Sequence, residues 1–256
     1  KLVLHFDVNG TIIAVDPASG QDLCMVVNTF LAGACWGKVV AGSWEWSAVT
    51  LSGSMQLACP EDAELSYYKY LEGCMADKPR SEFKKAVGSF SELHEQFRKV
   101  ADQIVSALVA PEALWETPFA FQQNGTWYHF VFPSVWKLLA SLQAEGRQVS
   151  VIVRTFGTDG PEIAKAIGAF AEGKHPDYPD GCPQLRLAGY HQGTLQLDEA
   201  SGMRLCLESE AGEQNTLQGE VPIFSHMDAL KGTLVLRDDY AWWAKRDYAA
   251  SAGKPL

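Results

Sequence analysis

The stretch Leu2-Val-Leu-His-Phe-Asp-Val-Asn-Gly-Thr11 decides the fold of this chain. Its residues 2–6 form a short apolar-rich run, typical of a strand that is buried on both faces of a parallel sheet. Asp7 ends the run, and a polar turn with Asn9 and Gly10 follows. A carboxylate directly after a buried strand predicts a polar site at the strand end, provided that other strands end beside it.

Two further strands of this kind are predicted, at 148–153 and 233–236. A helix over 133–146 precedes the first, with proline near its start and glycine at its end. A second helix over 161–172 follows it, because the apolar residues of that segment share one helical face. Strands that alternate with helices predict an α/β fold with a mostly parallel sheet and helices on both faces.

Polar residues follow all three predicted strands, and ligands bind at the carboxyl ends of such strands. The second strand leads into Arg154-Thr155, and the third leads into Arg237-Asp238-Asp239. We therefore expect Asp7, Thr155 and Asp238 to meet at one edge of the sheet.

The domain organisation follows from where this alternation is interrupted. The chain has 256 residues, 47% of them hydrophobic, enough for one large domain or two moderate ones. A long apolar stripe with helical spacing runs from Phe83 to Leu108. We predict a core of residues 1–19 and 129–256 with a mainly helical cap of residues 20–128. Short strands in 183–222 predict a hairpin-like excursion from the core.

Composition excludes several classes of partner. The formal net charge is −10, which argues against nucleic-acid binding through a broad basic face. No apolar run approaches the roughly 20 residues that span a bilayer, so no membrane partner is expected. The six cysteines form no CxxC pair or close Cys/His cluster, which predicts reduced thiols and a cytoplasmic protein.

Three segments resemble motifs of the haloacid dehalogenase-like (HAD) superfamily. Asp7-Val-Asn-Gly-Thr11 resembles motif I, which reads DxDGT in the family's phosphatases. The helix and strand that lead to Thr155 resemble motif II, and the segment 234–239 resembles motif IV. The resemblance implies a Rossmann-like three-layer core and Mg²⁺-dependent transfer of a phosphoryl group from a small phosphorylated molecule.

The resemblance also implies roles for individual residues. Asp7 would be the nucleophile and a metal ligand. The backbone carbonyl of Asn9 and the carboxylate of Asp238, with Asp239 as the alternative, would complete the protein ligands of Mg²⁺. Thr155 would hold phosphoryl oxygens, and the remaining substrate-binding residues would be Gly10, Thr11, Arg154, Phe156 and Gly157.

Two departures from the family pattern bear on activity. Asn9 stands where the family has a second aspartate, and an amide cannot transfer a proton near pH 7. General acid–base catalysis contributes about 10²–10⁴ in rate, so hydrolysis would be slow or altered. The family lysine before motif IV is also missing. Ser225 or His226 occupies its place, and nearby acids could raise the pKa of His226. Lys231, Lys165 and Lys174 are weaker candidates for this cation.

Two functions of different classes therefore stay open. The first is a Mg²⁺-dependent HAD-like hydrolase that acts through an aspartyl-phosphate on Asp7. The alternative is a catalytically inactive HAD-like binding or scaffold protein with a protein partner. Carbon–halogen or phosphonate cleavage is a weaker third reading, because we find no lysine in the cap that could form the Schiff base of a phosphonatase.

Overall fold

The computed structural model describes residues 1–16, 20–47, 59–61 and 63–246. The chain divides into two compact units, one of Lys1–Ile13 with Ala110–Leu256 and one of Ala14–Val109. Residues 110–128, which the sequence analysis assigns to the cap, are grouped here with the first unit. The expected core boundary at residue 19 lies outside the described residues.

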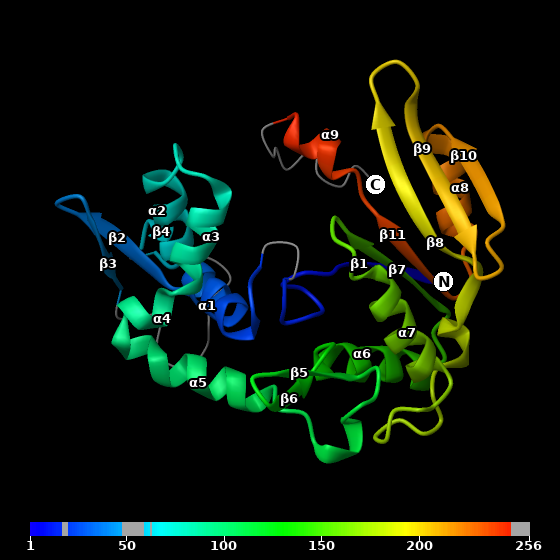
Figure 1. Cartoon of the computed structure of the whole chain (residues 1–256), viewed down its shortest axis with the longest axis horizontal. Coiled ribbons are helices and arrows are strands. Elements are labelled where there is room, and N and C mark those ends of the chain that lie inside the picture. Colours follow the sequence, from blue (N-terminus) through cyan, green and yellow to red (C-terminus); the bar gives the residue numbers. More distant parts are fainter. Residues whose placement is uncertain (17–19, 48–58, 62, 247–256) are drawn as a thin grey trace. The chain divides into compact units, whose positions relative to one another are not determined.

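The first unit is built around a six-stranded sheet (Figure 1). Four neighbouring strands run parallel, and the last two extend the sheet with antiparallel pairing. This confirms the predicted mixed α/β fold with a mostly parallel sheet. In spatial order the strands are β1 (Leu2–Asp7), β7 (Val149–Thr155), β11 (Thr233–Arg237), β8 (Leu187–Asp198), β9 (Gly202–Ser209) and β10 (Gln214–Gln218).

The central strands are buried on both faces, as their apolar runs predict. All seven residues of β7 and the first four of β11 are buried. α6 (Pro133–Ala144) leads into β7 and α7 (Gly160–Ala171) follows it, which confirms the two predicted helices. Each has a proline in its first turn, where a missing N–H removes no helical hydrogen bond.

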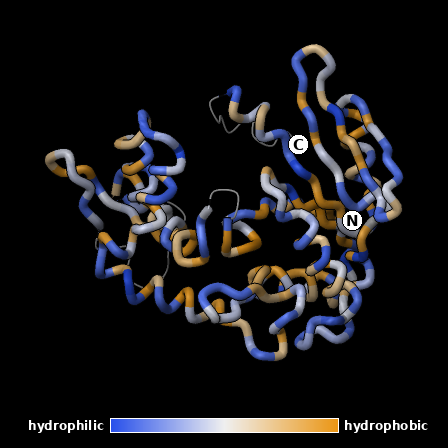
Figure 2. The backbone as a smooth tube through the Cα atoms, in the orientation of Figure 1, coloured by the Kyte–Doolittle hydropathy of each residue, from blue (hydrophilic) through white to orange (hydrophobic). Residues whose placement is uncertain are grey.

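α7 and α8 (Glu220–Ala229) lie on opposite faces of the sheet. Successive side chains of a strand point to opposite faces, so Val235 and Leu236 of β11 do so too. α7 approaches Val235 through Gly160, whereas α8 contributes to a buried cluster that contains Leu236. Figure 2 shows hydrophobic residues gathered where β7 and β11 run side by side.

The segment 183–222 joins the main sheet rather than forming a separate hairpin. β8 pairs in parallel with β11 and in antiparallel fashion with β9. Leu195, Leu205 and Leu207 are buried in the cluster under α8. Alternating polar and apolar residues fit a free hairpin and a sheet extension equally well, so the sequence pattern does not separate the two.

Two smaller elements complete the first unit. β5 (Ala120–Gln123) and β6 (Thr126–His129) form a hairpin around Asn124-Gly125, whose φ values are 51° and 80°. Such values are typical of a type I′ turn, for which Asn-Gly is the strongest sequence signal. This hairpin is not among the predicted elements. The short helix α9 (Tyr240–Ala244) follows β11.

The second unit combines helices with a short antiparallel sheet. Its aromatic core includes Trp44, Tyr67 and Phe90, whose rings pack edge-on or tilted against one another. β2 pairs with both β3 and β4. The elements are α1 (Leu23–Ala34), β2 (Trp36–Val40), β3 (Ser43–Trp46), β4 (Leu65–Ser66), α2 (Tyr67–Cys74), α3 (Arg80–Gly88), α4 (Phe90–Leu93) and α5 (Arg98–Ala107).

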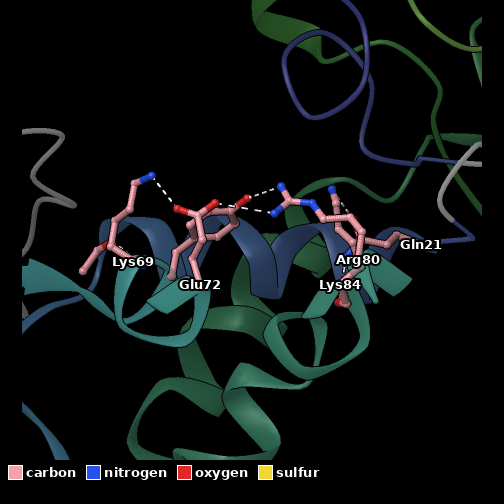
Figure 3. A network of polar contacts seen from close by, with 7 residues as sticks. Gln21, Lys69, Glu72, Arg80 and Lys84 are labelled. Carbon is pink, nitrogen blue, oxygen red and sulfur yellow. Dashed lines mark hydrogen bonds and ion pairs between the residues drawn. The ribbon is translucent and has the colours of Figure 1, made fainter. Parts of the chain in front are cut away.

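Polar contacts tie the helices of the second unit together (Figure 3). Glu72 of α2 accepts hydrogen bonds from Lys69 and Arg80, so it links α2 to α3. Lys84 of α3 donates to Gln21 at 3.2 Å, which fixes α3 near the start of α1. Within the described ranges, no helix of either unit has the length and apolarity needed to cross a membrane.

Candidate functional site

Asp7, Thr155 and Asp238 lie at one edge of the sheet. Asp7 and Thr155 are the last residues of β1 and β7, and Asp238 follows Arg237, the last residue of β11. These three strands are neighbours in the sheet. The structure thus brings the three strand ends together as expected, while the chemical roles of the residues stay predictions.

The loop after β1 folds tightly around Val8. Three successive backbone N–H groups, those of residues 11–13, donate to the Val8 carbonyl at 3.1, 3.0 and 3.3 Å. Gly10 has a φ of 71°, a left-handed conformation that favours glycine. The Thr11 hydroxyl donates to Oδ2 of Asp7 at 3.3 Å. The loop thereby holds the Asp7 carboxylate exposed at the sheet edge.

Asn9 places an amide oxygen in this loop, at the position where the resemblance leads one to expect a carboxylate. Its Oδ1 is buried and accepts no hydrogen bond from the described residues. Leaving a buried acceptor without a donor costs about 1–3 kcal/mol. The Asn9 oxygen is therefore an uncompensated buried acceptor in this loop.

The strand register places Arg154, and not Thr155, beside Asp7. Asp7 is the register partner of Arg154, so their side chains share one face of the sheet. Thr155 is the partner of Arg237 and therefore belongs to the opposite face, which α7 covers. The expected juxtaposition of the Thr155 hydroxyl with the Asp7 carboxylate does not follow from this register.

Arg154 forms a buried two-point ion pair with Asp238. Its Nε donates to Oδ2 at 3.3 Å, and its Nη2 donates to Oδ1. The two side chains are only 3% and 0% exposed. The planar fork of the guanidinium matches a carboxylate, and here it engages both oxygens. The strand between Asp7 and Asp238 thus supplies a buried cation to this edge.

Thr155 takes part in the turn that begins α7. Its hydroxyl donates to Asp159 at 3.2 Å and accepts from the Gly157 N–H at 2.8 Å. A Cβ on Gly157 would lie 2.7 Å from Oδ2 of Asp159, so a larger residue here would displace the Asp159 carboxylate. Both the hydroxyl predicted to hold a phosphate and the neighbouring N–H are used inside the chain.

Asp239 and Phe156 hold α9 in place. One oxygen of Asp239 accepts from the Trp242 N–H at 2.9 Å, and the other accepts from the Leu197 N–H at 3.1 Å. The ring of Phe156 stacks on that of Trp243, with centroids 4.7 Å apart and planes 3° from parallel. In the structure both residues therefore make contacts that support the fold.

His226 lies in the last turn of α8, before β11 begins, whereas Asp238 follows the end of β11. Burial lowers the pKa of His226, so its imidazole is neutral near pH 7. This direction is opposite to the raised pKa that the sequence analysis considered. The cation that pairs with Asp238 comes instead from Arg154, which was predicted to be among the substrate-binding residues.

Fold and site together define a mixed α/β protein with two carboxylates and a buried arginine at the carboxyl edge of its sheet. Comparison of the chain with protein-family models, curated proteins and solved structures gives no match. The HAD resemblance therefore rests on the order and placement of the sequence motifs.

Proposed function

We propose that this chain is a HAD-like binding protein without hydrolytic turnover. In this proposal the first unit is a Rossmann-like three-layer core and the Ala14–Val109 unit is its cap. The observation that carries the proposal is the buried pair of Arg154 with Asp238, because it engages the carboxylate that the resemblance assigns to Mg²⁺.

The residues present do not fit Mg²⁺ in the way that the resemblance implies. Mg²⁺ prefers oxygen ligands and is usually held by one or two carboxylates. Both oxygens of Asp238 bind the Arg154 guanidinium, and both oxygens of Asp239 accept backbone N–H groups. A metal would have to compete with a cation that belongs to the chain itself.

The groups for proton transfer and phosphate binding also favour a binding role. Asn9 replaces the carboxylic acid that would donate a proton to the leaving oxygen, and the lost acid–base catalysis is worth about 10²–10⁴ in rate. The Thr155 hydroxyl is bonded to Asp159 on the other face of the sheet. Asp7 alone of the predicted catalytic groups is an exposed carboxylate at the edge.

A slow Mg²⁺-dependent phosphate-ester hydrolase that acts through Asp7 is the second candidate. Two observations favour it: the exposed position of Asp7, and the unpartnered Oδ1 of Asn9 in the same loop. This candidate requires Asp238 to exchange Arg154 for the metal. The exchange would leave a buried guanidinium without its counter-ion, which is costly.

The proposed ligands are a small phosphorylated molecule or a protein partner, and the negative net charge argues against nucleic acid. All six cysteines are free thiols, which supports a reducing, cytoplasmic compartment.

The test is calorimetric titration of Mg²⁺ with beryllium fluoride into the full chain and into Asp7→Asn. Beryllium fluoride mimics a phosphoryl group on a carboxylate, so it reports an assembled nucleophile and metal site. We expect no heat that depends on Asp7, and no release of nitrophenol from p-nitrophenyl phosphate. Thermal unfolding of both proteins confirms that each is folded. Binding that is present in the wild type and lost in Asp7→Asn would overturn the proposal in favour of the hydrolase.

A further inference from the structure

A cavity of about 500 Å³ opens on the α7 face of the sheet, within the first unit. The first turn of α7 forms one wall and stands close to β11, since a Cβ on Gly160 would lie 2.8 Å from Cγ1 of Val235. Strands β7, β11, β8, β9 and β10 supply the floor. The volume is within the range of small-molecule sites.

The register aligns polar side chains in two rows across this floor. The first row crosses four neighbouring strands, and the second crosses three. A polar outer face is ordinary for an antiparallel sheet, but here it lines a cavity and several of its side chains are partly buried. The first row is Thr155, Arg237, Thr194 and Cys206, and the second is Gln192, Glu208 and Gln214.

Two charged side chains of opposite sign line this cavity, Arg237 and Glu208. Within the described part of the chain, neither has a hydrogen bond or ion pair through its side chain. β8 separates their strands, so the strands are about 10 Å apart. Arg237 lines the end of the cavity that is formed by the first turn of α7. The dipole of this helix adds to the attraction for an anion at that end.

We propose that this cavity binds a small zwitterion. Its anionic group, a carboxylate or a phosphate, pairs with Arg237, and its ammonium group pairs with Glu208. Thr194 and the amide of Gln192 lie between the charged residues and can bond polar atoms of the ligand's body. The inference extends the proposed binding function, but it places the ligand on the opposite sheet face from Asp7.

Three small probes separate the features of this ligand. Phosphoethanolamine has a phosphate and an ammonium group, β-alanine has a carboxylate and an ammonium group, and glycerol 3-phosphate has a phosphate without ammonium. Each is titrated calorimetrically into the full chain. We expect phosphoethanolamine or β-alanine to bind more tightly than glycerol 3-phosphate, and the tighter of the two identifies the anionic group.

Variants assign the two ends of the site. Arg237→Gln should weaken the zwitterion by about tenfold or more, because it removes a charge-assisted hydrogen bond. Glu208→Gln should weaken the zwitterion but leave glycerol 3-phosphate unchanged. Lys137→Gln and Glu210→Gln remove exposed charges outside the cavity, and they should change nothing.

Asp7→Asn distinguishes this inference from the proposed function. If the zwitterion binds Asp7→Asn with the same affinity as the wild type, its site lies away from the strand-end carboxylate, as inferred. Loss of binding in Asp7→Asn would place the ligand at the strand-end site and overturn the cavity assignment. The assignment would also be overturned if neither zwitterion binds, or if neither Arg237→Gln nor Glu208→Gln changes the affinity for the zwitterions.

Discussion

Arg154 of β7 forms a buried ion pair with Asp238, which directly follows the neighbouring strand β11, and Asp7 of β1 is the register partner of Arg154 on the other side. Removing charges from water offsets much of the attraction in such a pair, so the pair alone is weak evidence for stability. Removing one partner is different, because it leaves a buried charge without compensation.

Arg154→Met should therefore lower the free energy of unfolding by about 3–5 kcal/mol. The double variant Arg154→Met/Asp238→Leu should lose much less, because it removes both charges and leaves apolar groups that can pack. Urea denaturation of the wild type, both single variants and the double variant gives the coupling energy. If Arg154→Met and the double variant lose the same free energy of unfolding, Arg154 does not stabilise the protein through its ion pair with Asp238.

The same substitution should create sensitivity to divalent cations. Without the guanidinium, Asp238 and Asp7 are two carboxylates at one edge, which is a donor set that Mg²⁺ accepts. Mg²⁺ should raise the unfolding temperature of Arg154→Met and leave that of the wild type unchanged. Arg186→Met, which removes an exposed arginine, is the matched control. If Mg²⁺ raises the unfolding temperature of the wild type as much as it raises that of Arg154→Met, Arg154 does not compete with the metal for Asp238.

Asn9→Asp introduces the second aspartate of the DxDGT pattern that this loop resembles. We expect no measurable hydrolysis of p-nitrophenyl phosphate. The Asp238 carboxylate is still paired with Arg154, and the Thr155 hydroxyl still donates a hydrogen bond to Asp159. Phosphate release is compared with that of Asp7→Asn/Asn9→Asp, which removes the nucleophile. Turnover in Asn9→Asp that disappears in the double variant would support the hydrolase candidate.

The central strands and helices were predictable because their signals are local. The burial of β7 follows from an uninterrupted apolar run, and α6 and α7 follow from helical spacing with proline in the first turn. The common edge of Asp7, Thr155 and Asp238 follows from parallel pairing alone. None of these conclusions needs the exact register of the strands.

The neighbours of each strand-end side chain were not predictable, because they depend on register. A shift by one residue exchanges the faces of all side chains, and that decides whether Arg154 or Thr155 stands beside Asp7. The placement of β8 beside β11 is likewise a pairing between distant segments. The hairpin at Asn124-Gly125, by contrast, had a local signal.

Two glycines of the second unit should respond oppositely to alanine. A Cβ on Gly37 in β2 would lie 2.1 Å from the carbonyl oxygen of Glu45, so Gly37→Ala must separate paired strands. A Cβ on Gly33 in α1 meets nothing within 4 Å. We expect Gly37→Ala to destabilise by about 1–3 kcal/mol and Gly33→Ala to stabilise by about 0.5–1 kcal/mol. Urea denaturation of the two variants measures both effects, and similar values for the two would contradict this packing.

The stability of the second unit should fall in mild acid because of His94. This imidazole packs against the rings of Tyr67 and Phe90, at centroid distances of 4.7 and 4.9 Å, and its buried Nε2 has no partner among the described residues. Burial lowers its pKa below the ordinary 6.5, so the unfolded chain takes up the proton first as pH falls. Stability is therefore fully present above pH 6.5 and is lost as pH falls toward the folded-state pKa.

His94→Phe keeps an aromatic ring at this position but removes the group that titrates. Urea denaturation at about pH 7.5 and about pH 5.5 should show a smaller loss in His94→Phe than in the wild type. The other buried histidines are unchanged in both proteins, so the difference isolates His94. Equal losses in the two proteins would show that His94 is not protonated on unfolding in this range.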